Sequence, residues 1–427
     1  MSVKTPVIAV FDIGKTNKKV FLWDTSFQIV FEKQQHFAEM VDEDGFPCED
    51  LPALQQWIVS TFTELCQIPE FELIGLNFSA YGASFVYVDR TGEPVAPLYN
   101  YLKPASEPFP YADFGGEAEF ARRTASPILG NLNSGLQVYE ARSKPFWSEV
   151  FKAFHFPNYL ASLFTGKFLS EITSIGCHTA LWDFDKGQYH PWVSAIEDKL
   201  PPIASETSIE MDGINYGFGL HDSSAALVPY LRTVSDEFVL LSTGTWCIAM
   251  HPFNESPLSA AELAQDVLCY LQPNGKPVKA SRLFGGHFHE EQVARMEAHF
   301  GGSFTDLKFS NEVYELKPKA SSVFESAFAS RDLNDFLDLA SAYDQFMVDL
   351  VGQQICSLNF LLKEAPVKQL LVDGGFSKNE WYMRLLARAF PEIEVYAAEV
   401  AQASALGAAL LVYEGELPQN LIQLKRY

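Results

Sequence analysis

Residues 7–23 read VIAVFDIGKTNKKVFLW, and this stretch decides the fold. The apolar run at residues 7–11 stops at a polar segment, residues 12–17, and apolar residues then return in alternation, which predicts a strand, a tight turn and a second strand. Gly14 is expected to give the turn a positive φ and a close approach to a ligand. Asp12 ends the first strand, where its carboxylate is well placed to hold a hydrated metal ion. The turn also offers donors to phosphate oxygens, namely its backbone N–H groups and the side chains of Lys15, Thr16 and Asn17.

Two later stretches repeat this arrangement of a buried strand running into a polar turn. Residues 238–250, FVLLSTGTWCIAM, place Ser-Thr-Gly-Thr between two apolar runs, and residues 370–379, LLVDGGFSKN, lead a strand into Asp-Gly-Gly. The stretch GLHDSS, residues 219–224, lies between the first of these units, residues 7–23, and the second, residues 238–250. A lone DxGxT is compatible with an ordinary polar hairpin. A duplicated phosphate loop with a later glycine turn instead predicts a two-lobed ATP-binding enzyme with its nucleotide in the cleft.

Length and charge limit the possible partners. A chain of 427 residues is too long to fold around a single hydrophobic core, so we expect two or three domains. Lys and Arg number 31 against 54 Asp and Glu, a net charge of −23, which disfavours nucleic acid and anionic membranes. A polyanionic ligand must then be met by local cations and backbone dipoles in a pocket. Because no apolar run approaches the roughly 20 residues of a membrane span, we expect a cytoplasmic protein without membrane partners.

The six cysteines are scattered without CxxC or metal-ligand spacing, so we expect free thiols in the interior. Residues 281–290, SRLFGGHFHE, contain an HxH pair, but no third ligand cluster accompanies it. We therefore expect a glycine turn with exposed histidines there, in preference to a metal site.

Periodicity places the other elements along the chain. Helices are expected at residues 51–65, 154–166, 337–362, 379–389 and 401–412, and strands at 27–31, 71–78, 85–89 and 393–396. The break at residues 79–84, SAYGAS, can line a small-molecule pocket or form a bulge. Residues 231–236 are the best linker, which predicts an N-terminal domain at 1–233 and a C-terminal domain at 234–427.

The phosphate loops are not of the commonest kinds, because neither GxxxxGK[ST] nor a GxGxxG after a strand occurs. The blocks DIGKTNKK, PNYLASLFTG, GLHDSSA, STGTW and DGGFSKN with ASALGAA resemble the FGGY family of carbohydrate kinases, and within it the rhamnulokinase-like and fuculokinase-like members. The resemblance spans residues 7 to about 415. It implies an α/β fold of two actin-like (ribonuclease-H-like) domains, with the active site in the cleft between them.

The resemblance also implies an activity. The γ-phosphoryl group of ATP would pass, with Mg²⁺, to a hydroxyl of a small sugar, a ketose or deoxyketose such as L-rhamnulose or L-fuculose. Asp222 would be the general base that accepts the proton of the attacking hydroxyl. On the alternative reading, Asp222 only caps the helix that begins near Ser223.

The remaining site residues follow from the same motifs. The N-terminal domain would carry the sugar site, the first phosphate loop and the base, and the C-terminal domain the second phosphate loop and the adenosine site. Asp12 would hold Mg²⁺ through water. ATP would be bound by Asp12, Gly14, Lys15, Thr16, Asn17, Lys18, Gly244, Thr245, Gly374, Gly375 and Asn379. The sugar would be bound by Gly82, Ala83, His221, Asp222, Ser223 and Arg282.

The sequence departs from the family pattern near Gly82. Rhamnulokinases usually carry an aromatic and an acidic residue around this position, whereas residues 80–84 read AYGAS without the acid. The chain is also shorter than is usual for the family. A kinase of a pentulose or polyol therefore stays open, as do a non-catalytic actin-like nucleotide-binding protein and a sugar-sensing regulator. The quaternary state is expected to be a monomer or a homodimer.

Overall fold

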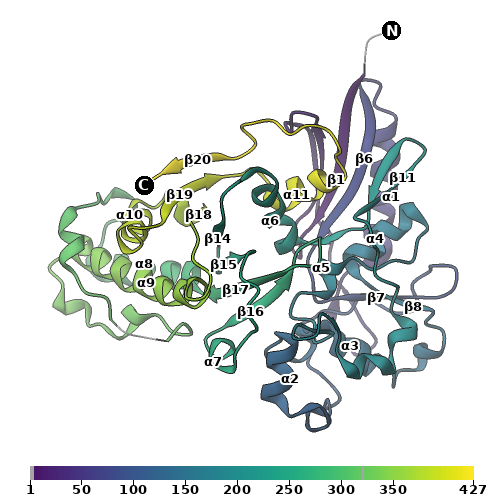
Figure 1. The fold of residues 1–427 in the computed structure, drawn as a ribbon, viewed down its shortest axis with the longest axis horizontal. Coiled ribbons are helices and arrows are strands. Elements are labelled where there is room, and N and C mark those ends of the chain that lie inside the picture. The colour runs from purple at the N-terminus through teal and green to yellow at the C-terminus, as the bar shows by residue number, and fades with distance from the viewer. Residues whose placement is uncertain (1–3, 320–321) are drawn as a thin grey trace. The chain divides into compact units, whose positions relative to one another are not determined.

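The computed structural model describes residues 4–319 and 322–427 and divides the chain into two compact units (Figure 1). Unit 1 comprises Met1–Thr233, Cys269–Lys276 and Ala401–Leu421, and unit 2 comprises Val234–Leu268, Pro277–Val400 and Ile422–Tyr427. The division thus assigns two segments beyond residue 233 to unit 1. Within the described ranges, no helix has both the length and the apolar character needed to cross a membrane.

The sheet of unit 1 is built around β1 (Thr5–Ile13) and β6 (Phe71–Ala80). Its order is β11-β12-β6-β1-β2-β3, and β13 (Leu220–His221) also pairs with β6. The predicted hairpin is confirmed, because β1 runs antiparallel to β2 (Lys18–Asp24). The other strands of the sheet are β3 (Ile29–Gln35), β11 (Ser208–Met211) and β12 (Ile214–Gly217).

Pairing in this sheet brings two distant carboxylates to one edge. Asp12 of β1 pairs with Ser79 of β6, and the short β13 runs parallel to the same end of β6, with His221 opposite Ala80. Carboxyl ends of parallel strands meet at one edge of a sheet. Asp222, which follows β13, is therefore delivered to the edge where β1 ends.

The helices of unit 1 bury apolar faces against this sheet. In α1 (Leu51–Cys66) the Asp50 side chain caps the first turn, Pro52 lies at the start, and Leu54 and Ile58 are buried, as the spacing predicted. The helix expected from residue 154 begins later, because Phe154 lies in strand β8 (Lys152–His155). The remaining helices of unit 1 are α2 (Glu117–Thr124), α3 (Ser134–Ala141), α4 (Phe156–Thr165), α5 (Ile172–Ile175), α6 (Asp222–Thr233) and α11 (Ala403–Leu411).

Helices α6 and α11 pack side by side (Figure 1). A Cβ atom on Gly407 of α11 would lie 1.8 Å from the carbonyl oxygen of Ala225 in α6, so only glycine allows this approach. The Ala- and Gly-rich composition of residues 401–412 predicted such close packing, and the prediction is confirmed.

A second core in unit 1 surrounds β7 (Phe85–Val88) and β8 (Lys152–His155), which pair antiparallel. Its buried side chains include Phe85, Tyr87 and Leu136. The shorter strands of the unit are β4 (Met40–Val41), β5 (Pro47–Cys48), β9 (Trp182–Asp183) and β10 (Gln188–Tyr189).

Unit 2 repeats the hairpin in a sheet of order β16-β17-β15-β14-β18-β19-β20. As predicted, β14 (Phe238–Thr243) turns into antiparallel β15 (Cys247–His251), and β18 (Gln369–Gly374) runs parallel to β14. The other strands are β16 (Val267–Leu271), whose last residues belong to unit 1, β17 (Pro277–Leu283), β19 (Glu394–Glu399) and β20 (Gln423–Arg426). The helices are α7 (Ala260–Leu263), α8 (Gly285–Phe300), α9 (Leu339–Leu362) and α10 (Glu380–Ala389).

The expectation of a glycine turn at residues 285–286 is wrong, because helix α8 begins there. A Cβ atom on Gly286 would lie 1.9 Å from the Gly244 carbonyl oxygen, so the glycine serves close packing against the β14–β15 turn. His287 is exposed, whereas His289 is half-buried with Nε2 3.1 Å from the Tyr343 hydroxyl. Among the described residues, no three His, Cys, Asp or Glu side chains are grouped to hold a metal ion.

All six cysteines carry free thiols, as expected. Four of them lie in the interior, whereas Cys66 and Cys356 are exposed.

Candidate active site

The β1–β2 turn closes on a backbone hydrogen bond from the Gly14 N–H to the Asn17 carbonyl oxygen, 2.9 Å. The expected positive φ at Gly14 is wrong, since Gly14 is not among the glycines with φ above zero. A Cβ atom there would instead lie 3.2 Å from the Asn17 carbonyl oxygen, so the residue is small because the turn is tight. Thr16 and Asn17 are exposed at its tip.

The two lysines of this turn are bonded to carboxylates. Lys15 Nζ lies 3.1 Å from Glu39 and 3.0 Å from Glu49, and Lys18 Nζ lies 3.1 Å from Glu49. Lys18 is buried and also donates to the Lys15 carbonyl oxygen at 2.7 Å. The buried Glu49 thus orders the turn, a role that nothing in its local sequence marked.

Asp222 opens helix α6 directly after β13, where the Ser223 N–H donates to its Oδ1 at 2.6 Å. The Ser223 hydroxyl lies 3.3 Å from the same oxygen, and His221 Nε2 lies 3.4 Å from it. The Asp222 side chain keeps 38% of its surface accessible, but the surrounding protein desolvates the carboxylate and raises its pKa to about 6. Burial lowers the pKa of His221 to about 4, so its imidazole is neutral at pH 7.

Asp12 shares this environment. The pKa of Asp12 is raised to about 6, because desolvation and the negative charge of Asp222 outweigh the opposing effect of the Ser79 and Ser404 hydroxyls. The Ser404 hydroxyl donates to Asp12 Oδ2 at 3.2 Å from the N-terminal turn of α11. Unit 1 therefore gathers Asp12, His221, Asp222 and Ser223 at one edge of its sheet.

A buried polar network supports β13 from behind. Thr173 accepts the His221 N–H at 3.2 Å and donates its hydroxyl to the buried Glu171 carboxylate. Desolvation raises the pKa of Glu171 to about 7. Asn158 donates to the Phe218 and Gly219 carbonyl oxygens at 2.9 and 3.1 Å. Sequence reasoning missed these supports, although Asn158 lies within the PNYLASLFTG block.

Gly82 and Ala83 adjoin the histidine. A Cβ atom on Gly82 would lie 2.8 Å from His221 Cδ2, so a side chain there would displace the imidazole. Ala83 is buried with φ 60°, and its carbonyl oxygen accepts the Gln137 Nε2–H at 2.6 Å. Gly82, in the segment 79–84 that was predicted to line a pocket or to form a bulge, thus packs directly against His221.

In unit 2, the second loop and the glycine turn meet at Thr243. Its hydroxyl accepts the Phe376 N–H at 2.9 Å and donates to the Asp373 carbonyl oxygen. Gly374 has φ 78°, and a Cβ atom there would lie 1.9 Å from the Thr243 carbonyl oxygen. Gly244 and Thr245 are exposed in the turn that follows Thr243.

The other two predicted residues of unit 2 have protein partners. Asn379 caps α10 by accepting the Tyr382 N–H, and its Nδ2 donates to the Tyr343 hydroxyl at 2.9 Å. Arg282 binds Asp266 through Nε at 3.0 Å and Nη2 at 2.6 Å. Its guanidinium also lies 5.5 Å from the centre of the exposed Trp246 ring. Within unit 2, Arg282 is thus associated with Asp266 and Trp246.

Comparison with known proteins finds a family match for the C-terminal part of the chain. Residues 240–413 match the family model described as the C-terminal domain of the FGGY family of carbohydrate kinases. The C-terminal part of this chain is thus similar to that domain. No curated protein matches the sequence closely enough to count as a relative.

Solved structures confirm the predicted fold over nearly the whole chain. A carbohydrate kinase from Novosphingobium aromaticivorans is 22% identical with a TM-score of 0.80, covering 98% of this chain and 95% of its own. A ligand-bound xylulose kinase from Lactobacillus acidophilus is 15% identical with a TM-score of 0.77, covering 99% and 93%. A gluconate kinase from the same organism is 14% identical with a TM-score of 0.73, covering 99% and 94%. The chain thus has the predicted α/β fold of two actin-like domains.

Proposed function

We propose that this protein is an ATP-dependent carbohydrate kinase of the FGGY family. It would phosphorylate a hydroxyl of a small ketose or deoxyketose, such as L-rhamnulose or L-fuculose, with Asp222 as the general base. The environment of Asp222 carries the proposal: its carboxylate lies beside neutral His221, with a pKa of about 6. A base is most effective when its pKa lies near the working pH, because it is then ionised yet still takes up a proton.

In this proposal Asp222 accepts the proton of the sugar hydroxyl as the oxygen attacks the γ-phosphorus, while the bond to the ADP oxygen breaks. The transition state of phosphoryl transfer is loose, so Asp222 orients the hydroxyl more than it activates it. The Ser223 N–H fixes one carboxylate oxygen. His221 and Ser223 would contact the sugar, with Gly82 and Ala83 alongside; Arg282 remains a candidate sugar contact.

For ATP, we assign the phosphates to the turn of residues 14–17 in unit 1 and to Gly244 and Thr245 in unit 2. Lys15 would exchange an exposed carboxylate partner, Glu39, for a phosphate oxygen. Lys18, already bonded to Glu49 in the interior, would hold the turn. The adenosine is assigned to Gly374, Gly375 and Asn379.

The residues present fit a magnesium ion at Asp12. Carboxylate oxygens suit Mg²⁺, which usually takes one or two of them and completes its octahedron with water and substrate phosphates. Asp12 offers such an oxygen, and its pKa is raised by burial and by the charge of Asp222, which a cation would offset. When bound, Mg²⁺ neutralises charge that develops on the phosphates.

The experiment that tests the proposal is an assay of ADP release across ketoses, deoxyketoses, a pentulose and a polyol, with ATP and Mg²⁺. Sugar-dependent ADP release that is strongest with a ketose or deoxyketose is expected. Strongest turnover of a polyol or pentulose would refute the substrate assignment, and full activity of Asp222→Asn would refute the mechanism.

A further inference from the structure

Unit 2 carries several cations around an open groove that no step of the proposed mechanism uses, although the whole chain has a net charge of −23. The groove lies between helix α10, strand β20 and the segment around residue 314, and we call it the α10–β20 groove. Its volume of about 770 Å³ falls within the roughly 300–1,000 Å³ of small-molecule sites. The cations that line it are Lys378, Arg384, Arg388, Lys425 and Arg426.

Three of these cations are already paired with carboxylates. The pairs are Arg384 with Glu380 at 2.8 Å, Arg426 with Glu394 at 2.6 Å, and Lys378 with Glu399 at 3.8 Å. Each pair cancels one positive charge, so these three side chains alone do not make the groove attractive to an anion.

Arg388 and Lys425 differ from the other three cations. In the part of the chain that the structure describes, neither side chain forms an ion pair with a carboxylate. The Arg388 guanidinium lies 4.3 Å from the centre of the Tyr314 ring, and Lys425 Nζ donates to the Tyr427 hydroxyl at 3.2 Å. Both cations are exposed. Because they line one groove without counter-charges, they raise the local concentration of anions there.

The donors of the groove suit phosphate and carboxylate groups. Arg384 and Arg388 are four residues apart, so helix α10 presents both from one face. A guanidinium offers two parallel donors that match two oxygens of a phosphate or carboxylate. The contact with Tyr314 holds the Arg388 guanidinium in place, which lowers the entropy lost when a ligand binds.

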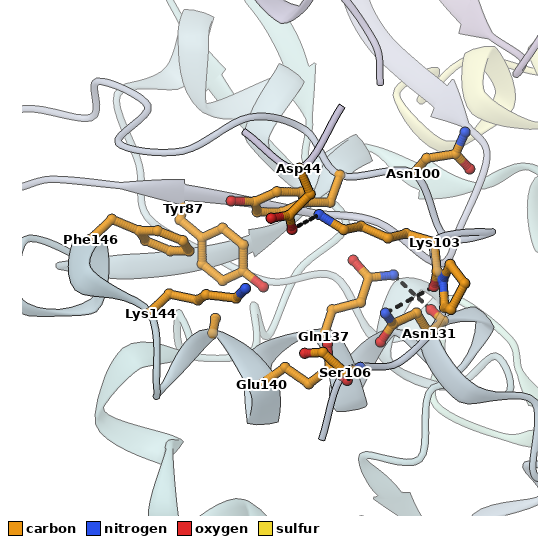
Figure 2. Close-up of a pocket in the computed structure, with 13 residues that line it drawn as sticks. Asp44, Tyr87, Asn100, Lys103, Ser106, Asn131, Gln137, Glu140, Lys144 and Phe146 are labelled. Atoms are coloured by element: carbon orange, nitrogen blue, oxygen red, sulfur yellow. Dashed lines mark hydrogen bonds and ion pairs between the residues drawn. The ribbon is translucent and has the colours of Figure 1, made fainter. Parts of the chain in front are cut away.

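The cavity of unit 1 in Figure 2 is the opposite case. Lys103 Nζ lies 2.6 Å from both Asp42 and Asp44, so two carboxylates already neutralise this cation. Figure 2 shows its bond to Asp44. That cavity, of about 50 Å³, has room for a few water molecules only. An anionic ligand is therefore expected in the α10–β20 groove and not in the cavity of unit 1.

The groove is separate from the residues assigned to ATP. Asn379, which is assigned to adenosine, does not line the groove, and its Nδ2 donates to the Tyr343 hydroxyl at 2.9 Å. Gly374 and Gly375 do not line it either. A ligand of the groove would therefore bind beside the nucleotide and not in its place.

We propose that the α10–β20 groove binds a small polyanion with two or more phosphate or carboxylate groups, through Arg388 and Lys425, with Arg384 as a further contact. This site goes beyond the proposed function, because its residues take no part in the transfer of the phosphoryl group.

Arginine labelling with phenylglyoxal, measured by mass spectrometry of peptides, tests the site residue by residue. Pyrophosphate and citrate are added in separate arms, which distinguish phosphate from carboxylate, against sodium chloride of equal ionic strength. At an anion concentration of about twice its Kd, labelling of Arg388 should slow about threefold. The internal control is Arg142, which is exposed and likewise lies over a tyrosine ring, 5.2 Å from the centre of Tyr139. Its labelling rate should not change.

Two matched variants test the contribution of Lys425. In Lys425→Gln, the anion concentration that half-protects Arg388 should rise about 2–5-fold, the loss of one exposed ion pair. Lys363→Gln removes an exposed lysine outside the groove and changes the net charge equally, so half-protection should need the wild-type concentration.

Four results would overturn the inference. They are no protection of Arg388 by either anion, equal protection of Arg388 and Arg142, the same half-protection in Lys425→Gln as in the wild type, and protection that grows with protein concentration alone. The last result would show that a second copy of the chain covers the groove. Protection of Arg388 in a protein that releases no ADP would support the groove assignment and refute only the proposed function.

Discussion

Replacement of Asp222 by asparagine should make the protein more stable and nearly inactive at the same time. The pKa of Asp222 is about 6 against 3.8 for an unperturbed aspartate, so ionising it in the folded state costs about 3 kcal/mol more than in the unfolded chain. Because 38% of the side chain remains accessible, solvent screening reduces this cost, and we expect Asp222→Asn to gain about 1–1.5 kcal/mol at pH 8. Asparagine can still accept the Ser223 N–H, so little is lost in exchange.

The pH at which this gain appears follows from the direction of the pKa change. A carboxylate whose pKa is higher in the folded protein binds a proton more tightly there, so the wild type loses stability as pH rises from about 4 to about 6. The difference between variant and wild type should therefore be absent below pH 4 and complete above pH 6. Urea unfolding at a series of pH values measures it.

The catalytic activity of Asp222→Asn should fall, although its stability rises. Without a base, kcat should fall by about 10²–10⁴-fold, while ATP and sugar still bind. In the wild type, kcat/KM should fall about tenfold per pH unit below pH 6 as Asp222 takes up a proton. A variant that keeps full activity would show that Asp222 is only a helix cap, and a variant that is destabilised at pH 8 would refute the desolvation of the carboxylate.

Three further substitutions test the segment beside His221 and the proposed ATP-binding turns. Gly82→Ala should displace His221 and lower the free energy of unfolding by about 1–3 kcal/mol together with kcat, which urea unfolding and the ADP assay measure; unchanged values would refute the contact. Gly374→Ala should cost at least about 2 kcal/mol in the same unfolding assay, because a Cβ atom meets the Thr243 carbonyl at positive φ; wild-type stability would contradict this. Lys15→Ala should raise the KM for ATP about tenfold with the sugar Kd unchanged, and an unchanged KM would exclude a phosphate contact.

Local patterns predicted most of the elements, because hydrophobic periodicity reports burial of each segment on one sheet or helix face. The β1–β2 and β14–β15 hairpins were found from apolar runs that end in polar turns, and α9 from its long helical spacing. Helix α8 was missed because its two starting glycines suggested a turn. They are instead required by the close approach of Gly286 to the Gly244 carbonyl, a contact between segments far apart in sequence.

The candidate site could be proposed from the sequence only where a motif carries its chemistry in adjacent residues. His221, Asp222 and Ser223 are such a run. Glu49, by contrast, binds both loop lysines, and no local pattern distinguishes it from the other acids of residues 42–50. Ser404, which donates to Asp12, lies 392 residues away from it, and sequence alone does not pair two such positions.

Because residues 401–421 belong to unit 1, this unit cannot complete its folding until nearly the whole chain has been synthesised. Helix α11 supplies the Ser404 hydroxyl to Asp12 and packs against α6, yet it leaves the ribosome about 180 residues after Thr233. At translation rates of about 5–20 residues per second, the nascent first unit waits roughly 10–40 s for this helix. During that interval the α6 surface that will receive Gly407 is uncovered, and it is a place where a chaperone can bind the growing chain.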